Sequence, residues 1–333
     1  MAERRELPTD RKARSAVLDD YMGVAHGVVN WDSLRDRAEV VFLTNPFRDT
    51  DDMVDQLQPY DAICLLRERS ALPAEVLKRL PNLKAIAATG KRNRTLDHVT
   101  AQALGITVMA TTGSGNGVLA TAELAWGLII GLMRHIPDEA AGMRTGAWQT
   151  RLGNALYGRT LGLVGLGKLG SHMAQIGRAF GMTVLAWSPN LTDERARAGG
   201  AELADKETLL RQSDIVSLHL VLGASTRGII GRDELALMGP DAILINTSRG
   251  PLVDEAALID ALQAGTIRAA GLDVFEHEPL PADHPLRSLP NALLTPHLGY
   301  TVRETLEQFY GDTVENLDSW LNGRPIRLYN PEG

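Results

Sequence analysis

The sequence predicts an α/β protein with doubly wound parallel sheets, and three observations support this fold class. Short apolar runs alternate with amphipathic stretches along most of the chain, as in consecutive βαβ units. The chain has 333 residues, more than one hydrophobic core usually supports, so two domains are expected. A turn with three glycines at residues 165–170 follows an apolar run and opens a helical pattern, which is typical of a dinucleotide-binding βα unit.

The first domain is predicted over roughly residues 13–110 as a small parallel sheet. Its strands are expected where short apolar runs occur, at residues 15–18, 40–43, 62–66, 84–88 and 106–110. An acidic amphipathic stretch at residues 51–57 suits a surface helix between two of these strands. The alternation therefore indicates a sheet covered by helices.

The loop at residues 88–94, which follows the fourth strand, carries Gly90 and three cations, Lys91, Arg92 and Arg94. Open α/β sheets bind ligands at the carboxyl ends of their strands, so this loop is a candidate site for an anionic substrate. A solvated basic loop explains the same residues equally well.

A helix is predicted over residues 119–135, with Glu123 as its only acid. Because a helix that is apolar on all sides must be covered on all sides, we expect it to run between the domains or to pack against a second subunit. We predict a homodimer built on this helix. Residues 148–157 either extend that contact or form an ordinary connecting loop.

The glycine turn is expected to join a buried strand at residues 160–164 to a helix at residues 168–180. Gly165 permits the tight turn, Gly167 lets the backbone approach a pyrophosphate, and Gly170 lets the helix lie close to the sheet. The N-terminal amides and the dipole of the helix then face the phosphates.

The next strand, at residues 183–187, ends in Ser188, where a site selective for NAD usually carries Asp or Glu. A serine does not repel the additional phosphate of NADP, and no arginine directly follows to bind it. Arg195 and Arg197 are the candidate phosphate partners. Ser188 therefore leaves both NAD and NADP open as the cofactor.

The remaining pattern has strands at residues 214–220, 242–246 and 269–272, separated by helices at residues 205–211, 233–238 and 254–264. Together with the runs at residues 160–164 and 183–187 these are five strands, and we interpret the pattern as a doubly wound sheet of six strands. A last helix is expected over residues 303–322, where Gly323 and Pro325 stop it.

Four polar residues fall just past predicted strand ends of the second domain: Arg249, Asp273, Glu278 and His297. They belong to an Arg-Gly element, a Leu-Asp-Val-Phe-Glu segment and a Pro-His-Leu-Gly segment, which follow the glycine turn in a defined order and spacing. In these motifs the chain resembles the D-isomer-specific 2-hydroxyacid dehydrogenases, and the resemblance covers nearly its whole length.

The resemblance implies two Rossmann-like domains, one inserted in the other. An NAD(P)-binding domain of residues 114–297 is expected within a flavodoxin-like substrate domain made of residues 1–113 and 298–333. The implied activity is hydride transfer between NAD(P)H and a small 2-oxo acid such as glyoxylate or hydroxypyruvate, which gives a D-2-hydroxy acid. Phosphoglycerate oxidation, which the cationic loop would tolerate, and a cofactor-sensing corepressor of the same fold are the alternatives.

By resemblance, Arg249 clamps the substrate, His297 is the acid/base, and Glu278 is the carboxylate partner of His297. Reducing a 2-oxo acid requires such a cation for the carboxylate and such an acid for the new alkoxide. Backbone amides near Lys91 and Arg92 are implied to hold the substrate carboxylate. The expected cofactor contacts are Gly165, Gly167, Lys168, Leu169, Gly170, Ser188, Leu220, Val221, Thr247, Arg249, Asp273, His297 and Gly299.

Each catalytic candidate also has a simpler explanation. Arg249 could cap a surface turn, Asp273 and Glu278 could be solvated loop acids, and a lone His297 is often structural. The resemblance places Asp273 opposite the nicotinamide carboxamide. The family often has a small residue where Tyr300 stands, so this ring is expected to narrow the pocket.

The composition excludes several classes of protein. The net charge is −7 and the chain lacks a long basic run, so neither nucleic acid nor an acidic membrane is expected as a partner. The single cysteine, Cys64, lies in an apolar run and indicates a buried thiol in a reducing, cytoplasmic location. No run of about 18 apolar residues marks a membrane span, and no metal site is expected.

Overall fold

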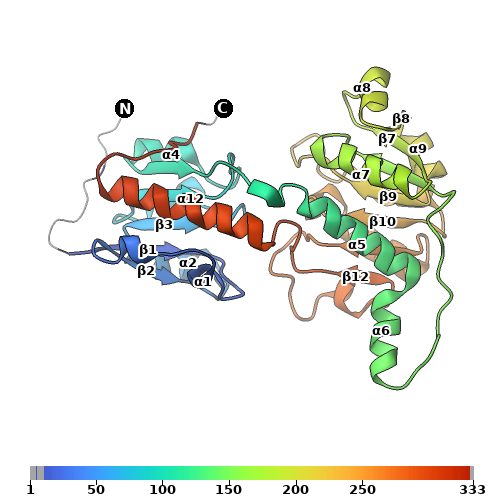
Figure 1. Cartoon of the computed structure of the whole chain (residues 1–333), viewed down its shortest axis with the longest axis horizontal. Coiled ribbons are helices and arrows are strands. Elements are labelled where there is room, and N and C mark those ends of the chain that lie inside the picture. Colours follow the sequence, from blue (N-terminus) through green and yellow to red (C-terminus); the bar gives the residue numbers. More distant parts are fainter. Residues whose placement is uncertain (1–4, 6–10, 331–333) are drawn as a thin grey trace. The chain divides into compact units, whose positions relative to one another are not determined.

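The chain folds into two compact units, each built on one parallel sheet (Figure 1). The computed structural model describes residue 5 and residues 11–330. One unit comprises Met1–Val118 and Val302–Gly333 and the other Leu119–Thr301, so the second unit is an insertion in the first. The domain boundaries expected from the sequence, after residues 113 and 297, lie a few residues before the two points where the chain passes from one unit to the other, after Val118 and Thr301.

The sheet of the first unit has five parallel strands in the order β2-β1-β3-β4-β5. All five were expected, and they are β1 (Ala13–Val17), β2 (Ala38–Phe42), β3 (Ala62–Leu65), β4 (Ala85–Ala88) and β5 (Thr107–Ala110). Every residue of β3 and β4 is buried, as in parallel strands with helices on both faces. The strand order is that of flavodoxin-like sheets, and it confirms the predicted fold class.

In the described residues, the helices of this unit are α1 (Ala25–Val28), α2 (Thr50–Leu57), α3 (Ala74–Lys78), α4 (His98–Ala103) and α12 (Arg303–Leu321). Two of these helices have an aspartate as their N-cap residue. Asp49 accepts a hydrogen bond from the Asp52 amide at the start of α2, and Asp97 accepts one from the Thr100 amide at the start of α4, both at 2.8 Å.

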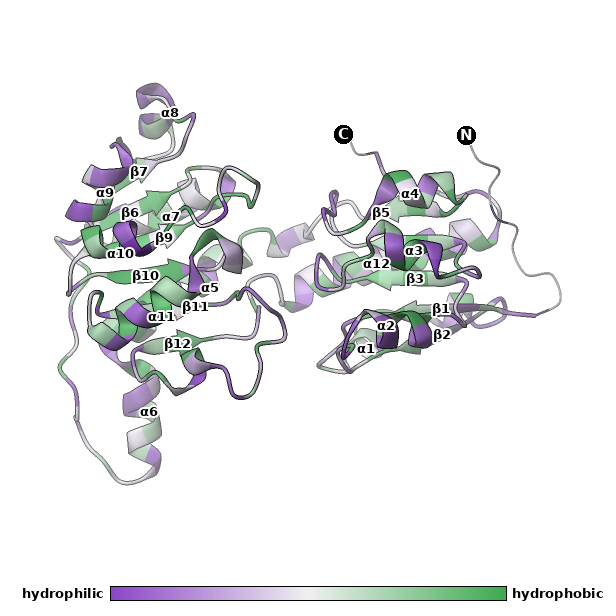
Figure 2. Ribbon diagram, turned by 180° about the vertical axis from the view of Figure 1, so that it is seen from behind, coloured by the Kyte–Doolittle hydropathy of each residue, from purple (hydrophilic) through white to green (hydrophobic). Residues whose placement is uncertain are grey.

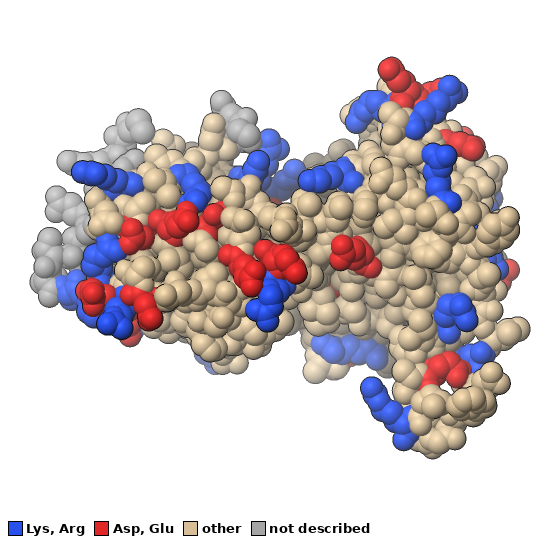
Figure 3. Space-filling model, viewed as in Figure 1, with Lys and Arg blue, Asp and Glu red and all other residues tan. Residues whose placement is uncertain are grey.

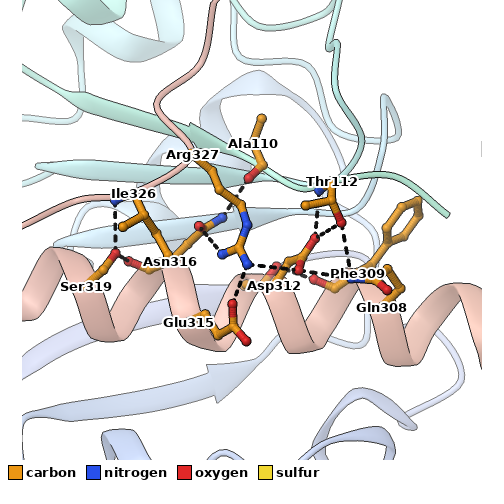
Figure 4. A network of polar contacts seen from close by, with 11 residues as sticks. Ala110, Thr112, Gln308, Phe309, Asp312, Glu315, Asn316, Ser319, Ile326 and Arg327 are labelled. Atoms are coloured by element: carbon orange, nitrogen blue, oxygen red, sulfur yellow. Dashed lines mark hydrogen bonds and ion pairs between the residues drawn. The ribbon is translucent and has the colours of Figure 1, made fainter. Parts of the chain in front are cut away.

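Helix α12 is tied to the sheet by a polar network (Figure 4). Asp312 is 4% exposed and accepts hydrogen bonds of 2.7 Å from both the amide and the hydroxyl of Thr112. Arg327 pairs with Asp312 at 3.3 Å, pairs with Glu315, and donates a hydrogen bond to Asn316. The network therefore joins the helix, the end of β5 and the C-terminal segment.

The C-terminal segment continues the sheet beyond β5. The Ala110 amide donates to the Arg327 carbonyl at 2.8 Å, and the Tyr329 amide donates to the Val108 carbonyl at 2.9 Å. The Tyr329 hydroxyl lies 3.4 Å from the backbone oxygen of Asn93. The segment thus covers an edge strand and reaches the basic loop at residues 88–94.

The sheet of the second unit has seven parallel strands in the order β12-β11-β10-β9-β6-β7-β8. They are β6 (Thr160–Val164), β7 (Thr183–Trp187), β8 (Glu202–Leu203), β9 (Ile215–Leu218), β10 (Ile243–Asn246), β11 (Ala269–Leu272) and β12 (Ala292–Leu294). The prediction of six strands was therefore wrong. β8 has two exposed residues and β12 three half-buried ones, too few for a periodic pattern.

The described helices of the second unit are α5 (Ala120–Arg134), α6 (Ile136–Arg144), α7 (Lys168–Ala179), α8 (Asp193–Ala198), α9 (Lys206–Gln212), α10 (Arg232–Met238) and α11 (Glu255–Ala264). The apolar helix α5 packs on β10, β11, β12 and α7 of its own unit through residues such as Trp126 and Ile129. The sheet of its own unit thus covers much of the surface that the sequence assigned to a domain boundary or a second subunit.

The exposed apolar residues of this region lie beyond α5. Ile136 and Met143 of α6 are 51% and 55% exposed. In the following connection Trp148, Leu152 and Tyr157 are 74%, 94% and 83% exposed. Large side chains this exposed are unusual on a monomer surface when they are grouped in one segment.

Hydropathy follows the layers of each unit. In Figure 2 the strands are mostly green, while most helices carry both green and purple residues. Basic and acidic side chains are both scattered over the face shown in Figure 3, and the described part of that face carries no continuous basic stripe. No helix among the described residues is both long and apolar enough to cross a membrane.

Candidate active site

The glycine turn is built as the sequence predicts, between β6 and α7. Gly165 has φ +107°, and a Cβ on it would lie 2.7 Å from the backbone carbon of His219. A Cβ on Gly170 would lie 2.2 Å from the Gly165 carbonyl oxygen. The protein's own packing therefore requires glycine at both positions.

Gly167 is different, because a Cβ there would meet no atom of the described residues within 4 Å. Gly167 is the N-cap of α7, and within the described part of the chain no side chain caps that helix. The packing of the described residues therefore does not require glycine at this position. This arrangement fits the pyrophosphate of a dinucleotide at the N-terminus of α7, beside Lys168 and Leu169.

Other predicted cofactor contacts lie at the carboxyl ends of the neighbouring strands. Thr247, after β10, has a buried Oγ1 without a hydrogen-bond partner among the described residues. Leu220 is half-buried and Val221 is 63% exposed after β9, and the Leu220 carbonyl accepts a hydrogen bond from Ser248 at 2.6 Å. An orphaned hydroxyl at this edge also fits a bound polar ligand.

Ser188 directly follows β7 and is half-buried. The two arginines considered as phosphate partners are both engaged locally. Arg195 donates to the Asn190 carbonyl at 3.1 Å, and Arg197 pairs with Asp193 at 2.8 Å. These contacts tie neither arginine to Ser188.

His297 and Glu278 form the central pair of the site. His297 Nδ1 lies 2.5 Å from one carboxylate oxygen of Glu278, and the other oxygen accepts a hydrogen bond of 3.0 Å from the Phe275 amide. The two side chains are 18% and 26% exposed. With the carboxylate at Nδ1, that nitrogen carries the proton, and Nε2 is left for chemistry.

The backbone of His297 is left-handed, with φ +54°. Such a conformation is uncommon outside glycine and persists only where the surroundings impose it. The His297 amide donates to the Asp273 carbonyl at 2.9 Å, and the Thr301 hydroxyl donates to the His297 carbonyl at 3.3 Å. The turn therefore fixes the direction in which the imidazole leaves the backbone.

The carboxylate of Asp273 holds the turn that carries His297 by hydrogen bonds. Its side chain is fully buried, and its two oxygens accept hydrogen bonds from the Thr295 hydroxyl (2.6 Å), the Leu298 amide (2.7 Å) and the Gly299 amide (2.8 Å). Burial raises the pKa of Asp273, and these hydrogen bonds oppose the increase. Three of the roughly four acceptor positions of the carboxylate are thus used within the protein.

Arg249 follows β10 on a neighbouring loop. Its Nη1 donates to the Ser248 carbonyl at 2.7 Å, and its own carbonyl accepts from Asn246 at 2.9 Å. A Cβ on Gly250 would lie 2.0 Å from the Phe275 carbonyl, so glycine lets this loop approach the loop that carries Glu278. The Arg-Gly element and the acidic segment are therefore packed together.

The described residues of this unit bring together most of the predicted cofactor and catalytic positions at one edge of the sheet. Another histidine, His219, lies behind Gly165, where burial lowers its pKa to about 4. It stays neutral at physiological pH and is no candidate acid. Among the described residues, no group of three or more His, Cys, Asp or Glu side chains could hold a metal ion.

Lys91 and Arg92 belong to the first unit, at the end of β4, and both are exposed. The loop around them is ordered by Asn93, which is 4% exposed and donates to the Arg67 carbonyl at 2.7 Å. The Gly90 amide donates to the Thr111 hydroxyl at 2.7 Å. The amides that the resemblance assigns to the substrate thus lie on a braced loop.

Arg67 is a candidate binding residue that the sequence analysis missed. It follows β3, has φ +56°, and lies over Gly90, where a Cβ would be 1.6 Å from its Nη1. Gly90 therefore makes room for a guanidinium at the carboxyl edge of this sheet. The available signal was an arginine directly after a predicted strand, which is a common pattern on its own.

Together, the fold and the site define a two-unit α/β protein with a dinucleotide-type βα turn and a histidine–carboxylate pair at the strand ends. The family model for the D-isomer-specific 2-hydroxyacid dehydrogenase NAD-binding domain matches residues 126–299. A glyoxylate reductase of Aeropyrum pernix is 40% identical over 280 residues, which cover 80% of this chain and 82% of that protein. The chain belongs to the D-isomer-specific 2-hydroxyacid dehydrogenase family.

Two further similarities describe its place among relatives. The D-3-phosphoglycerate dehydrogenase of Methanocaldococcus jannaschii is 35% identical over 276 residues, 82% of this chain and 52% of that protein. The chain therefore spans about half the length of this relative. A crystal structure of a D-3-phosphoglycerate dehydrogenase-like oxidoreductase from Ralstonia solanacearum has a TM-score of 0.87 and 36% identity and covers 96% of this chain and 97% of that one. The family's NAD-binding domain supports a nicotinamide cofactor.

Proposed function

We propose that the protein is an NAD(P)-dependent D-2-hydroxyacid dehydrogenase that reduces a small 2-oxo acid to the D-2-hydroxy acid. The observation that carries this proposal is the His297–Glu278 pair at 2.5 Å, in the same unit as the open glycine cradle at Gly167. The bound nicotinamide would supply the hydride. The 40% identity to a glyoxylate reductase favours acids of the size of glyoxylate or hydroxypyruvate.

The chain's own residues account for binding and proton transfer in this reaction. Arg249 binds the carboxylate of the acid through its planar fork. His297 begins as the imidazolium, with Nδ1–H held by Glu278, and gives its Nε2 proton to the substrate oxygen as that oxygen becomes a hydroxyl. Glu278 stabilises the imidazolium by its negative charge and keeps Nδ1 protonated afterwards.

In the first unit, we assign the amides near Lys91 and Arg92 to the substrate carboxylate. The basic side chains of the same loop also suit a substrate with a second anionic group. Oxidation of a phosphorylated hydroxy acid is therefore the second candidate. A corepressor of the same fold would bind the cofactor without appreciable turnover.

A panel assay separates these candidates. Glyoxylate, hydroxypyruvate, pyruvate and 3-phosphohydroxypyruvate are each mixed with NADH or NADPH, and loss of absorbance at the nicotinamide band is followed. We expect kcat/KM to be highest for an unphosphorylated acid. A preference for the phosphorylated acid would select the second candidate, and cofactor binding without turnover on any acid would reject an oxidoreductase.

Ser188 is the proposed determinant of cofactor choice. We propose that it lies at the adenosine ribose and tolerates both NAD and NADP. Ser188→Asp introduces a negative charge that repels the NADP phosphate, so the ratio of kcat/KM for NADH over NADPH should rise at least about tenfold. An unchanged ratio would place Ser188 away from the ribose.

We further propose that the protein is a cytoplasmic homodimer. The exposed apolar side chains of α6 and of residues 148–157 support a contact that extends from α5. Cys64 is 2% exposed, and burial raises the pKa of its thiol to about 12, which fits an inert cysteine in a reducing compartment.

A further inference from the structure

We propose that Tyr300 is a positioning residue for His297, whose ring it holds in the orientation that points Nε2 at the substrate oxygen. The inference rests on the proposed function, because it assigns a role relative to the proposed acid/base. It concerns a side chain that the resemblance marks only as a bulky departure from a usually small residue.

The two rings are in direct contact. The centroids of the His297 and Tyr300 rings are 5.4 Å apart, and their planes meet at 75°, which is an edge-to-face arrangement. This distance and angle lie within the range that aromatic pairs prefer. Tyr300 is half-buried, and the side chain of His297 is 18% exposed. The Tyr300 ring therefore shields one side of the imidazole from solvent.

His297 needs a second support besides Glu278. The bond to Cβ and the hydrogen bond at Nδ1 hold one side of the imidazole, but the ring can still tilt about the line that joins these two points. Tilting moves Nε2, which lies off this line, away from the oxygen that it must protonate. A misplacement of about 1 Å can cost about a hundredfold in rate, so a ring contact that stops this motion has catalytic value.

Hydrogen bonds hold the backbone on both sides of Tyr300, so that its ring can support His297. The preceding Gly299 amide donates to Asp273 at 2.8 Å, and the Gly299 carbonyl accepts from the Thr121 hydroxyl at 2.9 Å. The Thr301 amide, on the other side, donates to the Leu298 carbonyl at 2.8 Å. The backbone on both sides of Tyr300 is therefore held by the same turn that holds His297.

Kinetics of three variants test the role. Tyr300→Phe keeps the ring, Tyr300→Leu removes it, and Phe180→Leu is the control, since Phe180 contacts Trp126 elsewhere in the unit. With the best 2-oxo acid of the panel, we expect Tyr300→Phe to keep kcat within about threefold of the parent. Tyr300→Leu should lose kcat by at least about tenfold while KM changes little, and the control should match the parent.

The kinetic outcome can contradict the proposal in three ways. An unchanged kcat in Tyr300→Leu would remove the positioning role. Equal losses in Tyr300→Leu and Tyr300→Phe would assign the effect to the hydroxyl instead of the ring. A loss expressed mainly as a higher KM would make Tyr300 a substrate contact.

A second measurement does not depend on activity. In protein with ¹⁵N-labelled histidine, the ring signals of His297 are assigned by their absence in His297→Ala and are followed through a pH titration. Tyr300→Leu should change the His297 shifts and titration midpoint, whereas Tyr300→Phe should reproduce those of the parent. If no acid is reduced, the proposed function fails while this measurement still decides whether the ring contact controls the imidazole.

Discussion

At the scale of single residues, the proposed chemistry depends on one hydrogen bond, from His297 Nδ1 to Glu278 at 2.5 Å. The carboxylate fixes the tautomer, and the left-handed backbone of His297 fixes where the ring begins. The sequence could predict that both residues follow strand ends, because they stand in recognisable motifs after apolar runs. It could not predict the ring contact with Tyr300, because that depends on a turn held by the distant Asp273.

His297→Ala removes the proposed acid without touching the glycine cradle. We therefore expect kcat to fall by about 10²–10⁴-fold, the usual contribution of general acid–base catalysis. The Kd for the reduced cofactor, measured by nicotinamide fluorescence, should stay within about threefold of the parent. Activity that survives at the parent level would assign the proton transfer to another group.

Asp19 is a buried carboxyl with an unusual environment. Its Oδ1 accepts hydrogen bonds from Tyr21 and Ser70, but Oδ2 is buried without a hydrogen-bond partner among the described residues. Burial raises its pKa above the ordinary 3.8, against those hydrogen bonds. Because the unfolded chain ionises first, this group lowers stability as pH rises from about 3.8 through the pKa of the folded state.

The neutral variant Asp19→Asn should therefore gain stability relative to the parent as pH rises. We expect its advantage in Tm to be larger at pH 8 than at pH 4, by about 2–4 °C. Asp20→Asn is the matched control, since both Asp20 oxygens accept backbone amides at the start of α1, and it should lower Tm at either pH. An advantage that does not change with pH would mean that Asp19 is not the titrating group.

At the scale of secondary-structure elements, the strands could be predicted well and several helices could not. The runs at β3, β4 and β10 are buried at every residue, so their apolar character shows directly in the sequence. Helix α6 has no buried residue, and β8 is two residues long. Such elements form because of their contacts with neighbouring elements, and their own residues show too little hydrophobic periodicity to be predicted from the sequence.

The glycines of the βα turn stand at their positions for different physical reasons. A pair of variants separates the glycine proposed for ligand binding from one that the packing requires. Gly167→Ala adds a methyl group to open space, so Tm should stay within about 1 °C while the cofactor Kd rises at least about tenfold. Gly170→Ala places its Cβ 2.2 Å from a carbonyl oxygen and should lower Tm by several degrees. Tight cofactor binding by Gly167→Ala would show that the pyrophosphate does not lie at this residue.

At the scale of the whole molecule, the exposed apolar residues after α5 are the feature that supports the proposed dimer. We expect light scattering after size exclusion to give the mass of two chains. Leu152→Glu places a charge on a side chain that is 94% exposed and should shift the mass towards one chain. Leu203→Glu, at a 41% exposed position on β8, should leave the dimer intact.

A single-chain mass for the parent protein would contradict the dimer. A dimer that survives Leu152→Glu, together with Trp148→Glu, would place the interface on another surface. Either result leaves the proposed active site unchanged, because its assignment rests on Arg249, Glu278 and His297 of the inserted unit and not on the dimer.

The inserted unit has one more property that follows from its ends. The Thr121 hydroxyl, just after the chain enters this unit, donates to the Gly299 carbonyl, just before it leaves, at 2.9 Å. The two ends of the inserted unit therefore lie close together, so the first unit has only to span a short distance where the second unit is inserted. A protein built in this way can exchange its inserted unit as a module without changing the connectivity of the first unit.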